Sequence, residues 1–130
     1  MRAREEIERH HRVIERWLAG VADAAEFGVF AGAHAETFTL AGPDGRTLTR
    51  EQVLAEVRSA HGKAHGKAPG LAIEIRHIRE VAVAGPLLVA AYEEWQQGRG
   101  RLATVVLRQD QGGLSWLHLQ ETWIELPEPP

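Results

Sequence analysis

Apolar and polar residues in the first part of the chain follow the spacing of an amphipathic helix. Between Glu5 and Ala19 the apolar positions recur every three or four residues, and His11 fills one gap in the series. The apolar positions of this series are Ile7, Ile14, Leu18 and Val21. Gly20 can end a helix because glycine adopts a left-handed conformation at little cost, so we expect a first helix that stops there.

Two later segments have the form of a capping box, in which the first residue and the fourth bond each other's backbone amides at a helix start. Asp23 and Glu26 form the first box, which predicts a short second helix that ends near Gly32. Thr49 and Gln52 form the second box, which predicts a third helix that continues to residue 62.

After residue 70 the pattern changes from helical spacing to alternation, which predicts strands. Four strand-like runs follow one another, at residues 71–81, 87–96, 102–108 and from 114 onward. The turns between them are short and rich in glycine, so neighbouring strands should be antiparallel. Earlier runs at 36–40 and 46–48, joined by a Gly-Pro-Asp-Gly turn, predict a small hairpin. Together these elements predict an α+β domain whose antiparallel sheet curls around the helices.

Length and charge narrow the classes of function. A chain of 130 residues with a net charge of -3 is typical of a single domain, here spanning residues 1–130 with a frayed proline-rich tail at 127–130. The lack of a basic excess argues against nucleic-acid binding, and no run approaches the ~20 apolar residues of a membrane span. The chain has no cysteine, which excludes disulfides and thiolate metal sites. We therefore expect a cytoplasmic protein with neither nucleic-acid nor membrane partners.

The last strand carries three polar side chains in a row. His118, Gln120 and Thr122 share one face, because side chains alternate across a strand. The other face carries apolar residues, namely Leu117, Leu119 and Trp123. A polar row among apolar neighbours predicts that its face lines a cavity.

Several histidines raise the question of a metal site. His61 and His65 are four residues apart, as helical metal ligands often are, but glycines follow both and favour a flexible connector instead. His10 and His11 are adjacent and point in different directions on a helix, so we expect one of them to face the edge of the core. His77 interrupts the alternation of its strand, which predicts a bulge or a dimer contact. We therefore expect neither a metal nor a cofactor.

Three motifs and the order of the elements carry a family resemblance. The motifs are Phe-Thr-Leu-Ala-Gly-Pro-Asp-Gly at 38–45, Val-Ala-Ala-Tyr-Glu-Glu-Trp at 89–95 and Gly-Gly-Leu-Ser-Trp-Leu-His-Leu-Gln-Glu-Thr at 112–122. Over about residues 5–125 the chain resembles the nuclear transport factor 2-like superfamily, nearest to its SnoaL-like proteins and to the association domain of calcium/calmodulin-dependent kinases. The last strand of those branches often reads apolar-His-apolar-His-x-Ser. Here Gln120 replaces the second histidine, which removes one titratable group.

The resemblance implies a cystatin-like cone, in which a strongly curved antiparallel sheet wraps around a long N-terminal helix and two shorter helices. It also implies a pocket between sheet and helices, and commonly a homodimer formed through sheet faces. If the polar row of the last strand points inward, alternation across neighbouring strands selects its companions in the pocket. The expected pocket residues are Trp17, Phe30, His34, Phe38, Tyr92, Glu94, Thr104, Val106, His118, Gln120 and Thr122.

Three function classes stay open. The first is a small-molecule-binding domain, expected to form a homodimer, whose ligand is apolar or carbonyl-bearing. The second is an isomerase, dehydratase or cyclase in which Glu94, Tyr92 and His118 move protons on an apolar carbonyl substrate, with burial raising the pKa of Glu94 toward that of a working base. The third is a non-catalytic dimerisation module that pairs through the apolar face of the last strand.

Overall fold

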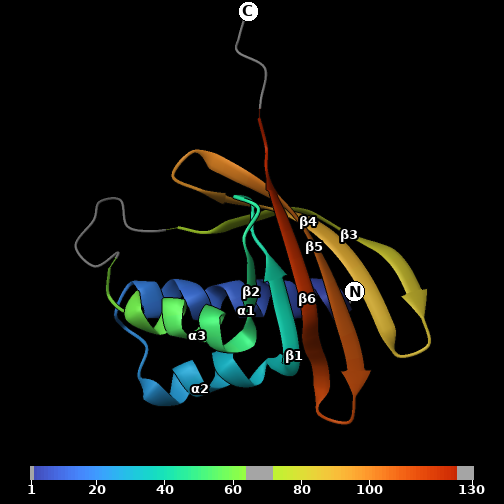
Figure 1. Cartoon of the computed structure of the whole chain (residues 1–130), viewed down its shortest axis with the longest axis horizontal. Coiled ribbons are helices and arrows are strands. Elements are labelled where there is room, and N and C mark those ends of the chain that lie inside the picture. Colours follow the sequence, from blue (N-terminus) through green and yellow to red (C-terminus); the bar gives the residue numbers. More distant parts are fainter. Residues whose placement is uncertain (1, 64–71, 126–130) are drawn as a thin grey trace, which may run out of the picture.

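Three helices lie together on one side of a bent, six-stranded sheet (Figure 1). The computed structural model describes residues 2–63 and 72–125. The helices are α1 (Arg2–Leu18), α2 (Ala24–Gly32) and α3 (Arg50–Ser59). The strands are β1 (His34–Ala41), β2 (Thr47–Thr49), β3 (Glu74–Ala84), β4 (Leu87–Gln96), β5 (Arg99–Asp110) and β6 (Gly113–Trp123).

The sheet is mixed. Its order is β2-β1-β6-β5-β4-β3, and β3 to β6 form the antiparallel meander that the short turns predicted. Strand β1 pairs with β2 in antiparallel orientation, as predicted, and with β6 in parallel orientation. The parallel pair escaped prediction because no short turn joins β1 to β6. The expected fold, a curved sheet around a long N-terminal helix with two shorter helices, is confirmed, although the sheet is not wholly antiparallel.

The two predicted capping boxes differ in the structure. At the start of α3 both bonds are present, since the Gln52 amide donates to the Thr49 hydroxyl at 3.3 Å and the Thr49 amide donates to the Gln52 side chain at 2.9 Å. At the start of α2 only Asp23 acts as a cap, accepting from the Glu26 amide at 2.9 Å. The Glu26 carboxylate instead accepts two bonds from Arg16, both at 2.8 Å, and so joins α2 to α1.

A bulge in β6 decides which side chains face the helices. Val106 lies opposite His118, but Leu107 lies opposite Trp116, so Leu117 is an extra residue on β6. A bulge shifts the two-residue alternation of its strand by one position. Trp116 and Leu119, three residues apart, therefore both face the helices.

A second bulge lies in β3, at His77, where a bulge or a dimer contact was expected. The pairing of β3 with β4 shifts between Arg76 and Arg79, and His77 between them has a positive φ of 57°. That left-handed conformation is unusual for a residue with a Cβ atom and is typical of a bulge. His77 is exposed, so its bulge shapes the edge strand and leaves the core intact.

The end of α3 rests on α1 through His61. Its ring centroid lies 4.0 Å from that of Trp17, and its Nε2 lies 3.1 Å from the Ala22 carbonyl oxygen. The remainder of the expected connector, including His65, lies outside the described residues, as does the tail expected at 127–130. In the described ranges, no helix is long and apolar enough to cross a membrane.

Candidate functional site

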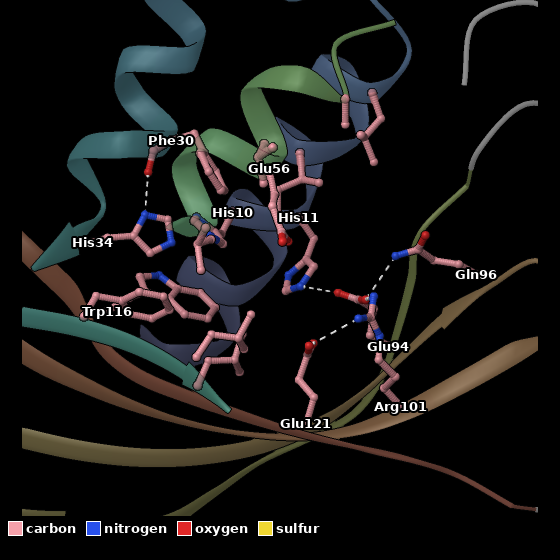
Figure 2. A pocket seen from close by; sticks show the side chains of 18 residues that line it. His10, His11, Phe30, His34, Glu56, Glu94, Gln96, Arg101, Trp116 and Glu121 are labelled. Carbon is pink, nitrogen blue, oxygen red and sulfur yellow. Dashed lines mark hydrogen bonds and ion pairs between the residues drawn. The ribbon is translucent and has the colours of Figure 1, made fainter. Parts of the chain in front are cut away.

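A cavity of about 300 Å³ lies between the inner face of the sheet and the three helices (Figure 2). Its walls are mainly apolar. The apolar lining consists of Ile14, Leu18, Phe30, Phe38, Leu40, Val53, Val57, Ala60, Trp116 and Leu119. Two groups that contain polar side chains border the same space, and the second also includes Phe30 and Trp116 of the apolar wall. We call the group of His11, Glu94, Gln96, Arg101 and Glu121 the ionic cluster, and the group of His10, His34, Phe30 and Trp116 the histidine end.

The ionic cluster ties α1 to three strands through Glu94 and Arg101. Nε2 of His11 on α1 lies 2.7 Å from Oε1 of Glu94 on β4, and the Gln96 amide donates to Oε2 of Glu94 at 3.0 Å. Arg101 lies directly opposite Glu94 on β5 and donates to the same Oε2. Its other terminal nitrogen donates to Oε1 of Glu121 on β6 at 3.2 Å, as the dashed lines in Figure 2 show.

Hydrogen bonding fixes the protons of His11. Its Nδ1 lies 2.7 Å from the Ile7 carbonyl oxygen, which can only accept, so Nδ1 carries a proton. Its Nε2 faces the Glu94 carboxylate, and an ionised carboxylate can only accept as well. With Glu94 ionised, both nitrogens of His11 are therefore placed to donate hydrogen bonds.

Glu94 is held in its ionised form. Burial alone raises the pKa of a carboxyl group, but the hydrogen bond and charge of His11, with the charge of Arg101, outweigh burial and lower the pKa of Glu94 to about 2. A carboxylate with so low a pKa is a poor proton acceptor near neutral pH. The expectation of a raised pKa for Glu94 is therefore wrong, because His11 and Arg101 outweigh burial. The sequence alone did not show that these two side chains lie beside Glu94.

Glu121 differs from Glu94 although both contact Arg101. Only 7% of Glu121 is exposed, and burial raises the pKa of its carboxyl group, with the charge of Glu94 adding to the effect. Arg101 acts in the opposite direction but does not cancel the rise. The cavity thus holds two nearby carboxyl groups whose pKa values are pushed apart, an arrangement that separates acid and base roles.

The histidine end is built from stacked rings. His10 is 3% exposed and lies between Phe30 and Trp116, with ring centroids 5.0 Å and 4.3 Å away and interplanar angles of 18° and 28°. His34 meets His10 edge-on at 5.0 Å, and its Nδ1 lies 2.9 Å from the Phe30 carbonyl oxygen. The Trp116 indole donates to Glu6 at 2.8 Å, which fixes the ring under His10.

Both histidines of this end are neutral near neutral pH. Burial lowers the pKa of His34 to about 4, against the opposing effect of its backbone hydrogen bonds. Burial also lowers the pKa of His10 well below its usual 6.5, and the nearby His11, His34 and Arg9 add to the effect. Within residues 2–63 and 72–125, no three histidine or acidic side chains are grouped so as to hold a metal ion.

Five expected pocket residues lie on the outer face of the sheet. They are Thr104, Val106, His118, Gln120 and Thr122. The expected cross-strand partners are right, since Thr104 lies opposite Gln120 and Val106 opposite His118, but the face is wrong. The neighbouring Leu119 and Glu121 line the cavity, and adjacent residues of a strand point to opposite faces.

His118 therefore contacts the outer surface of β1. Its Nδ1 lies 2.7 Å from the hydroxyl oxygen of Thr39, which is its direct partner in the parallel β1–β6 pair. From the sequence, the polar face of the last strand was expected to point into the cavity. Leu119 and Glu121, one apolar and one acidic, occupy that face because Arg101 partners the acid.

Four expected pocket residues do line the cavity: Phe30, His34, Phe38 and Glu94. Tyr92 is on the inner face of the sheet, but it is packed in the core and only 1% of it is exposed. Its ring centroid lies 5.4 Å from that of His11. Its hydroxyl has no hydrogen-bond partner among the described residues, and burial raises the pKa of Tyr92 well above 10. Tyr92 is thus next to the ionic cluster but outside the lining.

Trp17 is also outside the lining. Its indole donates to the Val57 carbonyl at 2.6 Å, and its ring packs on Phe27 at 4.7 Å in a second core cluster. Trp17 is buried, but the side of α1 that it occupies faces α2 and α3.

The sequence reasoning missed most of the polar lining. His10 and His11 appeared only as an adjacent pair, of which one was expected at the edge of the core, and Arg101 and Glu121 were not among the expected pocket residues. Glu121 gave a signal that could have been used, since an acid on the apolar phase of a strand requires a buried partner. The pairing of Glu94 with Arg101 across a four-residue turn region at 97–100 was a second usable signal.

We expect Glu94→Gln to lower the free energy of unfolding by about 3 kcal/mol, because it leaves His11 and Arg101 without their buried counter-charge. Urea denaturation measures the change. Glu93→Gln is the matched control, since Glu93 faces the other side and accepts from the Trp95 indole at 2.9 Å, a bond that an amide oxygen also accepts. The control should lose less than about 1 kcal/mol. Equal losses in the two variants would contradict the role given to Glu94.

We also expect stability to fall as pH drops from about 6.5 to 4.5. The pKa values of His10 and His34 are lowered in the folded state, so the unfolded state binds more protons in this window. Each histidine contributes a loss of up to about 1.4 kcal/mol per pH unit. Glu121 acts in the opposite sense because its pKa is raised. The measurement is therefore a comparison of unfolding free energies against pH for the wild type and His10→Phe. The variant should lose less stability on acidification, and parallel curves would refute the prediction.

Comparisons with known proteins identify the fold and family. No family model matches the sequence, and no curated protein matches it. The chain is similar to the crystal structure of an NTF-2-like protein of unknown function from Pseudomonas aeruginosa, with 34% identity over 96% of this chain and 100% of the other, and a TM-score of 0.87.

Two more distant structures share the fold. ActVI-ORFA from Streptomyces coelicolor is 15% identical over 96% of this chain and 97% of the other, with a TM-score of 0.64. A candidate calcium/calmodulin-dependent protein kinase type II association domain from Thiobacillus denitrificans is 18% identical over 86% of this chain and 93% of the other, with a TM-score of 0.61. The resemblance and the cystatin-like fold expected from the sequence are thus confirmed. The chain belongs to the nuclear transport factor 2-like family.

Proposed function

We propose that the protein binds a small, largely apolar molecule in the cavity, with a carbonyl group of that molecule next to the ionic cluster. The observation that supports this proposal is the pairing of apolar walls with a few fixed polar groups in a space of about 300 Å³. Small-molecule sites commonly have this composition and a volume of ~300–1,000 Å³.

Arg101 is suited to bind the carbonyl oxygen. It uses its two terminal nitrogens on Glu94 and Glu121, and a guanidinium group carries five N–H donors, so donors remain. Its side chain is 25% exposed, whereas Glu94 is 5% exposed. The ionic cluster therefore offers a positively charged donor toward the cavity while its inner carboxylate stays enclosed.

A second candidate function is proton transfer on a carbonyl substrate, with Glu121 as the acid or base. Glu121 lines the cavity, has a raised pKa and lies beside Arg101, which could stabilise a developing oxyanion. The earlier candidates are less suited, because Glu94 has a pKa of about 2 and His118 points to the outer face. This candidate keeps the class of isomerase, dehydratase or cyclase chemistry but changes the residue.

Dimer formation through the outer face of the sheet stays a prediction. That face carries half-buried or exposed side chains such as Leu102, Val106 and Leu117. The dimerisation module expected from the sequence would pair through Leu117, Leu119 and Trp123, but Leu119 lines the cavity, so we assign that role to the outer face instead.

We expect Leu119→Trp to abolish binding of a two-ring ketone such as β-tetralone, because an indole at this wall position fills the cavity. Isothermal titration should give at least about a ten-fold loss of affinity. Gln120→Trp is the matched control, since Gln120 is the next residue on β6 and is exposed on the other face. It should bind like the wild type. Failure of the wild type to bind two-ring probes, or equal losses in the two variants, would refute cavity binding.

For the second candidate, we expect the wild type to speed exchange of the α-protons of β-tetralone with deuterium oxide by about 100-fold or more over buffer. Proton NMR measures the exchange. Glu121→Gln should remove the acceleration, since an amide cannot take up the proton. Glu56→Gln, which changes a carboxylate at the exposed rim of the same cavity, should keep it. Exchange no faster than in buffer would rule out this candidate and leave binding intact.

A further inference from the structure

The histidine end contains a buried polar atom that no other described residue satisfies. Nδ1 of His10 is enclosed and has no hydrogen-bond partner among the described residues. The ring is fixed by Phe30 on one face and Trp116 on the other, so only its edge is available for a hydrogen bond. A buried polar group without a partner costs stability, and its presence beside a cavity is a reason to look for a ligand group there.

His34 supplies a second atom of defined character. Its Nδ1 must carry the proton, because the Phe30 carbonyl at 2.9 Å can only accept. Nε2 of the neutral ring is then a hydrogen-bond acceptor. Figure 2 shows the ring with its second nitrogen turned from Phe30 toward His10, and both side chains line the cavity.

We propose that the histidine end binds an uncharged hydroxyl group on a ring of the ligand, which donates to Nε2 of His34 and accepts from the edge of His10. This inference rests on the proposed binding function and deepens it, because it specifies the chemical class of the ligand as a ring alcohol or phenol. The rings of His10 and His34 are adjacent, with centroids 5.0 Å apart, so one hydroxyl group can lie beside both.

Other polar groups fit this end less well. A carbonyl oxygen accepts only, so it would leave Nε2 of His34 unsatisfied. A carboxylate would lose its hydration beside two neutral rings without gaining a cation, because burial keeps the pKa of both histidines low. A hydroxyl group both donates and accepts, and it needs no counter-charge.

The two polar regions then have different tasks. The ionic cluster presents Arg101, a charged donor suited to a carbonyl oxygen, while the histidine end presents a neutral acceptor and donor. His10 and His11 are adjacent on α1, but His10 belongs to the histidine end and His11 to the ionic cluster. The ligand class that fits both is a ring compound with a hydroxyl group and a carbonyl group at separate positions.

The test compares two probes of similar shape, β-naphthol and β-fluoronaphthalene, of which only the first can donate a hydrogen bond. Isothermal titration or competition gives the ratio of their dissociation constants for the wild type and for His10→Phe. His10→Phe replaces an unpartnered polar ring with an apolar one, so it should fold. We expect the preference for naphthol to fall by about ten-fold in this variant, while affinity for fluoronaphthalene is kept.

Phe30→Leu is the matched control, because it changes the same wall without removing a side-chain hydrogen-bonding group. It should weaken both probes and leave their ratio unchanged. A measurement on the wild type needs no variant: the nitrogen resonance of His34 Nε2 should shift when naphthol binds and stay in place with fluoronaphthalene.

The outcomes separate the two proposals. If both probes bind and their ratio is the same in the wild type and His10→Phe, or the Nε2 resonance does not respond, the hydroxyl site is wrong and cavity binding stands. If neither probe nor β-tetralone binds the wild type, cavity binding is wrong and the hydroxyl site falls with it.

Discussion

The carboxylate of Glu94 is the group on which the arrangement of helix and sheet depends. It accepts from His11 on α1, from Arg101 on the neighbouring strand and from Gln96 on its own strand. Each of those donors would be costly to bury alone, and the carboxylate would be costly without them. The sheet can therefore bend over α1 only in the position where these groups meet. That position leaves the space beside them unfilled by side chains.

The cavity has two chemically distinct regions because of one property of helices. Adjacent residues of a helix point in directions about 100° apart. His10 consequently stacks between aromatic rings at one region, while His11 bonds Glu94 at the other. The same residue type is neutral in the first position and a double donor in the second, and the difference comes entirely from what surrounds each ring.

The sequence predicts the helices and strands well but the residues that line the cavity poorly. Helical period, capping boxes and glycine-rich turns are local features, so the helices, the hairpin and the meander could be read from them. Phe30, His34, Phe38 and Glu94 were found because they lie on the buried phase of their elements. The sequence did not show which face of β6 points toward the helices, because the buried position of Glu121 depends on Arg101, its partner on the neighbouring strand. The pairing of β1 with β6 was equally hidden, since it joins segments far apart in the chain.

The extra residue at Leu117 has a consequence for how this fold diversifies. If Leu117 were instead paired regularly, the rest of β6 would slip by one residue along β5, and the imidazole and the amide now on the convex surface would replace Leu119 and Glu121 against the helices. An acidic hollow would become a neutral one with no change in any helix. A one-residue slip in strand register is thus a short evolutionary route by which related chains can exchange the ligands they accept.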